Sequence, residues 1–134
     1  MKRAPILLLS VLLCFILSSC REKRSNNAEE CYMLWAGEKP GKEVFAIHGQ
    51  FWQSAHFTKE YIVYLELAPT PKWCAAFIKQ NSLIKTDNIA ILPTDAPAWF
   101  TPPQNVNLWK QSSGNTLYMQ DRQTGRFFIY EEQL

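Results

Sequence analysis

The chain has 134 residues, of which 47% are hydrophobic and 13% aromatic, with 14 Lys and Arg against 12 Asp and Glu. This length allows one small domain with its own core, and no internal repeat or second linker divides it. The formal net charge of +2 is too small for the concentrated basic surface that nucleic-acid binding needs, so we exclude nucleic acid as a partner.

The N-terminal residues have the layout of an export signal. Two cations, Lys2 and Arg3, precede the stretch 6–17, which is apolar except for Ser10. A permanent membrane-spanning helix needs about 20 apolar residues, so this stretch is short for that role. Export through a cleaved leader follows from the pattern.

The end of this stretch carries a second signal, Leu17-Ser18-Ser19-Cys20. It resembles the lipobox of bacterial lipoprotein precursors, and the resemblance covers residues 1–20 only. It implies that residues 1–19 are a signal peptide and that Cys20 is acylated and anchors the chain in a bilayer of the cell envelope. Arg21 follows at the position where Asp tends to retain enterobacterial lipoproteins in the inner membrane, which implies the outer membrane if there are two. An ordinary secretory signal or a short N-terminal anchor is the alternative.

Removal of the signal peptide would change the charge balance of the chain and leave a polar segment at the new N-terminus. Removal of Lys2 and Arg3 reduces the 14 basic residues to 12, equal to the 12 acidic ones. Residues 20–30 then comprise the lipidated cysteine and ten residues without a large apolar side chain. We expect a flexible tether there, with a reach of roughly 17 Å. A single globular domain would occupy residues 31–134.

Two further cysteines, Cys31 and Cys74, remain after processing. An exported protein meets an oxidising compartment in many bacteria, so an even number of cysteines predicts a disulfide between them. In the chain-entropy account a loop of this length contributes roughly 4 kcal/mol of stability. The alternative is a pair of unpaired thiols, with Cys74 buried as a small core residue.

The clearest helix signal lies in residues 70–81. Thr70 is a good N-cap and Pro71 suits the first helical position. The residues that share one face at helical spacing are Cys74, Phe77, Ile78 and Asn81. We therefore expect one amphipathic helix that packs on a flat partner.

Short runs of branched and aromatic residues supply that partner. Strands are predicted at residues 43–48, 61–67 and 88–92, and a hairpin at 115–120 and 126–131 turns through Gly125. The fold class that follows is α+β, with a mainly antiparallel sheet of about five or six strands and one amphipathic helix packed on it.

The proline-dense segment 93–103 presents Trp99 and Phe100. These two aromatics either close one end of the core or form an exposed anchor for a partner, as aromatics do at interface hot spots. Trp52 poses the same question. All three are candidate partner-binding residues.

Catalytic signatures are missing from the sequence. It has no Gly-rich phosphate loop, no Gly-x-Ser-x-Gly elbow and no His-Glu-x-x-His, and we expect no cofactor, no metal and no enzyme. The expected function is therefore a non-catalytic interaction module, held in the membrane through Cys20, whose partner is an envelope protein, the cell wall or a toxic effector. The alternative is a small-molecule binding protein or cryptic hydrolase with a polar cleft that contains His48, His56, Glu66 or Asp95.

Overall fold

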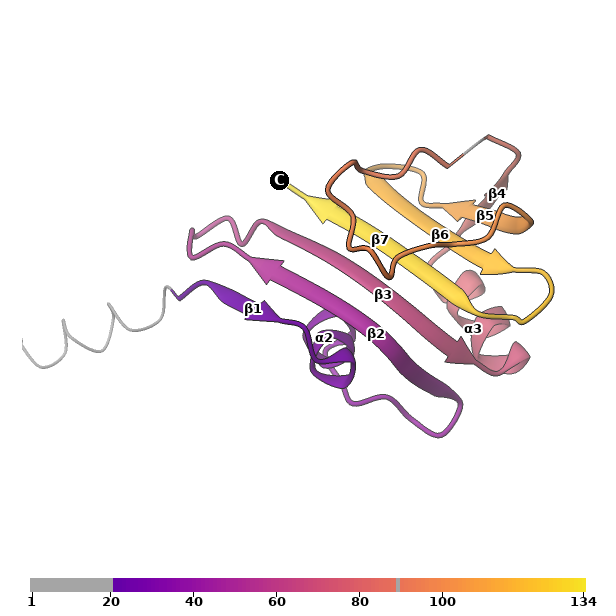
Figure 1. Cartoon of the computed structure of the whole chain (residues 1–134), viewed down its shortest axis with the longest axis horizontal. Helices are drawn as coiled ribbons and strands as arrows, with labels where there is room; N and C mark the ends of the chain where they lie inside the picture. The colour runs from indigo at the N-terminus through magenta and orange to yellow at the C-terminus, as the bar shows by residue number, and fades with distance from the viewer. Residues whose placement is uncertain (1–20, 89) are drawn as a thin grey trace, which may run out of the picture.

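The computed structural model describes residues 21–88 and 90–134, so the predicted signal peptide and Cys20 lie outside the described residues. Within them the chain forms an antiparallel sheet in the order β1-β2-β3-β7-β6-β5-β4 (Figure 1). The elements are β1 (Lys23–Ser25), α2 (Ala28–Ala36), β2 (Val44–Gln53), β3 (Tyr61–Pro69), α3 (Pro71–Gln80), β4 (Ile84–Thr86), β5 (Val106–Lys110), β6 (Asn115–Asp121) and β7 (Phe127–Gln133). The α+β class is confirmed, with seven strands and two helices in this part of the chain. None of the helices described is long and apolar enough to cross a membrane.

The central strands follow the predicted pattern. β3 covers the predicted run 61–67, and β6 and β7 form the predicted antiparallel hairpin, with Gly125 at φ +73° in the turn. Asp121 holds this turn because its side chain accepts hydrogen bonds from the Gln123 backbone N–H, over 2.8 Å, and from the Thr124 hydroxyl. The hairpin carries β7 to the middle of the sheet, beside β3.

Helix α3 confirms the helix predicted at residues 70–81. The Thr70 hydroxyl accepts a hydrogen bond from the Trp73 backbone N–H over 3.2 Å, as an N-cap does. Cys74 is buried, and Phe77 and Ile78 pack against the core on the same face. Asn81 ends the helix as its C-cap.

The predicted tether at residues 21–30 needs correction. β1 pairs with the edge of β2, and α2 begins at Ala28, where the side chain of Asn27 caps the Glu30 backbone N–H over 2.9 Å. Polar residues suit both elements, since β1 is an edge strand and the first turn of α2 faces solvent. The globular part therefore includes residues that precede Cys31.

Strand β2 extends well beyond the predicted run 43–48 because Gly49 continues the strand. A register shift between Ala46 and His48 marks a β-bulge. Helix α2 lies directly on Gly49, where an added Cβ would stand 2.6 Å from the Cβ of Cys31. The glycine thus permits a close approach of helix to strand that no other residue type allows.

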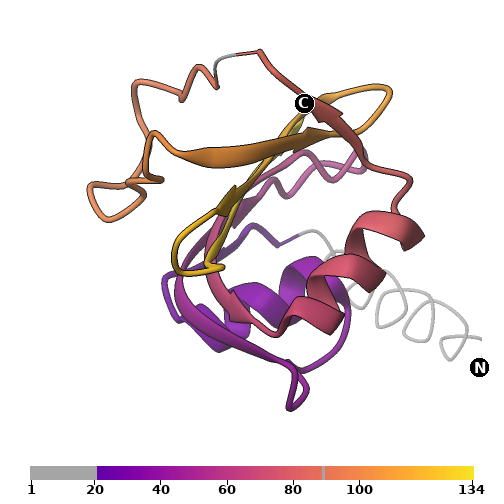
Figure 2. The same cartoon turned by 90° about the vertical axis from the view of Figure 1, so that its right-hand side faces the viewer.

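Both faces of the sheet are covered. Figure 2 shows α2 and α3 on the same face of the sheet, where the core includes Phe51, Leu65, Leu67, Phe127 and Ile129. The long connection from β4 to β5 packs on the other face, over Tyr64, Met119, Phe128 and Tyr130. The predicted strand at 88–92 is wrong, because Asn88 and residues 90–92 belong to this irregular connection. Residue 89 is outside the described residues.

Candidate functional site

A cleft of about 530 Å³ separates α2 from α3 on the helix-covered face. Tyr118 from the middle of β6 and Glu131 of β7 lie at its floor, and the segment between α2 and β2 forms part of its rim. The lining residues are Tyr32, Trp35, Ala36, Glu38, Glu43, Trp73, Ala76, Phe77, Gln80, Asn81, Gln111, Tyr118 and Glu131. The volume is in the range of small-ligand sites.

Glu131 is the polar centre of this cleft. Its carboxylate accepts a hydrogen bond from the indole nitrogen of Trp35 over 2.9 Å and one from the Tyr118 hydroxyl over 3.3 Å. The Tyr61 hydroxyl donates to the other carboxylate oxygen. Three donors from α2, β3 and β6 thus fix the orientation of one half-buried carboxylate.

Aromatic side chains form the walls around this carboxylate. Trp73 and Phe77 stack on α3 with ring centroids 5.0 Å apart, and Trp35 of α2 meets Phe77 at 5.6 Å. Tyr118 packs edge-on against Phe77 from the floor. Aromatic rings and the Glu131 carboxylate therefore line the same space.

The charge of the cleft is negative. Its lining includes Glu38, Glu43 and Glu131 but no Lys, Arg or His. At the rim, Glu43 pairs with Lys72 over 3.0 Å. Among the residues that the structure describes, no cation lies within salt-bridge distance of Glu131.

The tyrosines around Glu131 remain hydrogen-bond donors well above neutral pH. Burial is the main cause that raises the pKa of Tyr61 above its ordinary value, and the hydrogen bond to Glu131 adds to it. Burial and the nearby negative charge of Glu131 raise the pKa of Tyr118 in the same way. The carboxylate therefore keeps these two phenolic donors.

The aromatic pair proposed as a partner anchor is largely inside the fold. Phe100 is 3% exposed and packs on Tyr64 and Phe128, so it closes the core beneath the β4–β5 connection. Trp99 is half-buried and stacks on His48 with ring centroids 5.1 Å apart. The core-closing alternative holds for Phe100.

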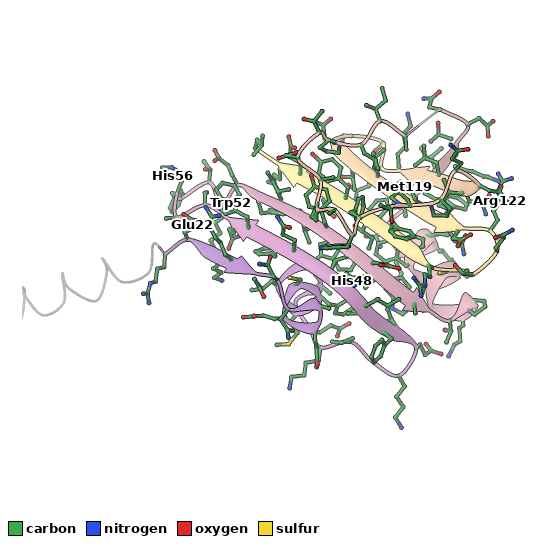
Figure 3. The ribbon with its side chains drawn as sticks, viewed as in Figure 1. Glu22, His48, Trp52, His56, Met119 and Arg122 are labelled. Carbon is green, nitrogen blue, oxygen red and sulfur yellow. The ribbon has the colours of Figure 1, made fainter. Side chains whose placement is uncertain are left out.

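The structure does not bring Trp52 to this pair. Trp52 is half-buried near the end of β2, where its indole nitrogen donates to Glu22 over 2.9 Å. Figure 3 shows Trp52, Glu22 and His56 at the end of the sheet where the described chain begins, away from His48. The three predicted partner-binding residues therefore lie at two separate places.

The predicted disulfide between Cys31 and Cys74 is absent, and both cysteines are buried free thiols. The Cys31 thiol donates to the Ser25 carbonyl over 3.3 Å at the β1 side, whereas Cys74 lies near Gln120 of β6. Cys31 packs on Gly49 of β2, and two strands, β3 and β7, lie between β2 and β6. The two thiols therefore face different parts of the core.

The four residues expected to line a polar cleft do not lie together in the fold. Glu66, with a side chain 4% exposed, binds Nδ1 of His48 over 2.7 Å and the guanidinium of Arg126 over 2.6 Å. His56 lies in the β2–β3 loop, and Asp95 lies in the β4–β5 connection. None of these residues lines the cleft between the helices. Glu66, His48 and Arg126 form an ion-pair cluster on the other face of the sheet, and neither His56 nor Asp95 belongs to it.

The sequence interpretation did not select Glu131, Trp35, Tyr61 or Tyr118. One signal was available: Glu131 continues the alternation of Phe127 and Ile129, which places a carboxylate on the apolar face of the last strand.

Searches of protein-family models, of curated proteins and of solved structures find no match to this chain.

Proposed function

We propose that this protein is a lipid-anchored envelope protein whose domain binds a ligand with a positively charged amine or guanidinium group in the cleft between α2 and α3. One observation carries the ligand class. The cleft lining contains three carboxylates and five aromatic rings but no basic residue. Glu131 accepts three hydrogen bonds but has no cationic partner among the described residues, so a bound cation adds a charge-assisted interaction.

The chemistry of the cleft fits such a group. A carboxylate offers about four lone-pair positions, and Trp35, Tyr61 and Tyr118 occupy three of those of Glu131. A fourth position accepts a charge-assisted hydrogen bond from the ligand. The aromatic rings that line the cleft attract the same cation through their quadrupoles.

Two sources supply this chemistry: a free small cation, or a Lys or Arg side chain on a partner protein. The second source retains the interaction-module function, with the contact moved from Trp99 and Phe100 to the helix cleft. Burial of Phe100 favours this move, because a buried ring offers no surface to a partner.

The test is a tryptophan-fluorescence titration of the full-length protein in detergent. The probes are cadaverine for the free cation and the peptide Gly-Gly-Lys-Gly-Gly for the side chain, with norleucine in place of lysine as the neutral control. We expect saturable binding of at least one cationic probe and none of the neutral peptide. Binding by cadaverine alone identifies a small-molecule site, and preference for the peptide identifies a protein partner.

Matched variants locate the binding site. Glu131→Gln keeps the side-chain shape but removes the charge, and we expect it to weaken cation binding at least tenfold, which corresponds to about 1.4 kcal/mol. Glu132→Gln is the control, because Glu132 lies on the opposite face of β7 and accepts from Tyr130. Equal affinity in both variants, or no cation binding by the parent, overturns the proposal.

The anchor has its own test, which does not depend on the ligand. In the native host we expect the parent protein in the membrane fraction and Cys20→Ala in the soluble fraction. Retention of Cys20→Ala in the membrane contradicts lipidation and indicates that residues 1–20 act as an anchor themselves.

A further inference from the structure

The loop between β2 and β3 carries the most exposed large apolar side chain among the described residues. Phe57 is 97% exposed in the segment 54–60, which follows Gln53 at the end of β2. Gln53 pairs with Lys23, the first residue of β1. The exposed ring thus lies at the end of the sheet where the described chain begins.

Only a short stretch of chain joins this end of the sheet to Cys20. Glu22 is fixed to the sheet, because its carboxylate accepts the Trp52 indole N–H over 2.9 Å. Cys20 precedes Glu22 by two residues, a span of at most about 7 Å between Cα atoms. Acyl chains on Cys20 would therefore hold this end of the sheet against the headgroups, in place of the roughly 17 Å reach expected for a flexible tether.

We propose that this end of the domain is a membrane-docking surface and that Phe57 inserts into the lipid bilayer. The proposal rests on lipidation of Cys20, which belongs to the proposed function. Trp52 is half-buried beside Glu22 at the same end, and an indole with an apolar body and a polar tip suits the headgroup level.

Charge contributes little to this docking. Arg21, Lys23, Arg24 and Lys59 belong to the segments at this end, and Glu22, Glu60 and Glu132 oppose them there. Arg24 also pairs with Glu22. The contact therefore depends on the apolar ring rather than on anionic lipid.

The test uses one environment-sensitive fluorophore at one of two cysteines. Phe57→Cys is compared with Phe45→Cys, since Phe45 is also exposed, at 71%, but lies near the other end of β2, where it pairs with Ala68. Cys31 and Cys74 are buried, so neither competes for the reagent. The labelled full-length proteins are reconstituted into vesicles of phosphatidylethanolamine and phosphatidylglycerol, and the unsubstituted protein gives the background.

We expect the fluorophore at position 57 to emit at shorter wavelength on vesicles than in detergent-free buffer and to be quenched by nitroxide-labelled lipid. The fluorophore at position 45 is expected to show neither effect. Flotation of the protein with the vesicles while position 57 stays in water overturns the docking but leaves the anchor intact. Failure of the protein to float overturns the anchor and the docking with it.

Discussion

The indole nitrogen of Trp35 lies 2.9 Å from a carboxylate oxygen of Glu131, a residue 96 positions later in the chain. This hydrogen bond joins α2 to the central strand β7 across the cleft. Tyr61 and Tyr118 donate to the same carboxylate from β3 and β6. One charged group thus links three strands and a helix, so the cleft and the stability of the domain depend on the same contacts.

Replacement of Trp35 by Phe tests the structural part of this link. The variant keeps an aromatic ring but removes one donor from a half-buried carboxylate, so we expect a loss of about 2 kcal/mol in the free energy of unfolding. Urea denaturation followed by circular dichroism measures it. Trp52→Phe is the control, because it removes an indole donor from the exposed Glu22 and should cost less. Equal losses in the two variants contradict a special role for the bond to Glu131.

Gly49→Ala tests the close approach of α2 to β2. The new Cβ would stand 2.6 Å from the Cβ of Cys31 and 3.1 Å from the Cα of Ala28, and the helix backbone cannot yield without moving α2. We expect a loss of about 1–3 kcal/mol in urea denaturation. Gly41→Ala is the matched control, since no heavy atom lies within 4 Å of its added Cβ. An unchanged midpoint for Gly49→Ala would show that α2 does not pack on this residue.

The two core thiols should stay reduced and unreactive in the native protein. Burial raises the pKa of both Cys31 and Cys74, which lowers the thiolate fraction at neutral pH. We expect a thiol reagent to label them only after unfolding, and we expect dithiothreitol to leave the urea midpoint unchanged. A midpoint that falls on reduction would reveal a disulfide between them.

Alkaline pH should destabilise the fold through its tyrosines. Burial is the main cause that raises the pKa of all five, and it raises that of Tyr64 to about 12. The folded state therefore keeps phenolic protons that the unfolded chain loses near the ordinary tyrosine pKa of about 10. Their contribution to stability is complete below that pH and is lost as the pH rises through the folded values.

Two measurements check this alkaline loss. Phenolate absorbance of the native protein should appear well above the pH at which the urea-unfolded protein shows it. The urea midpoint should fall between pH 10 and pH 12, and fall less in Tyr64→Phe. Phenolate absorbance that appears at the same pH in both states contradicts the burial of these side chains.

The sequence predicts the elements whose signals are local. Thr70 and Pro71 mark the start of α3, and Gly125 marks the turn of the last hairpin, because a cap or a turn depends on neighbouring residues only. Helix α2 also had such a signal in Asn27, with Cys31, Tyr32, Leu34 and Trp35 on its packed side. This helix was not predicted because residues 21–30 are polar, and an edge strand followed by an exposed first helical turn has the same composition as a flexible tether.

The site depends on strand order, which no local pattern specifies. Tyr61 and Glu131 meet because β3 pairs with β7. Trp35 reaches Glu131 from α2, which packs at Gly49 on β2, the strand next to β3. Periodicity places Glu131 on one face of its strand but does not say which element covers that face. The wrong prediction of a disulfide has the same origin, since the positions of Cys31 and Cys74 across the sheet follow from the strand order.

The most direct test of cation binding in the cleft is the nuclear magnetic resonance signal of the Trp35 indole N–H in the full-length protein during a titration with cadaverine or the lysine peptide. This N–H donates to Glu131, whereas that of Trp52 donates to the distant Glu22 and serves as the internal control. We predict that the Trp35 signal shifts in a saturable manner, that the Trp52 signal stays in place, and that the shift disappears in Glu131→Gln. A Trp35 signal that does not move with either cation would contradict the proposed function.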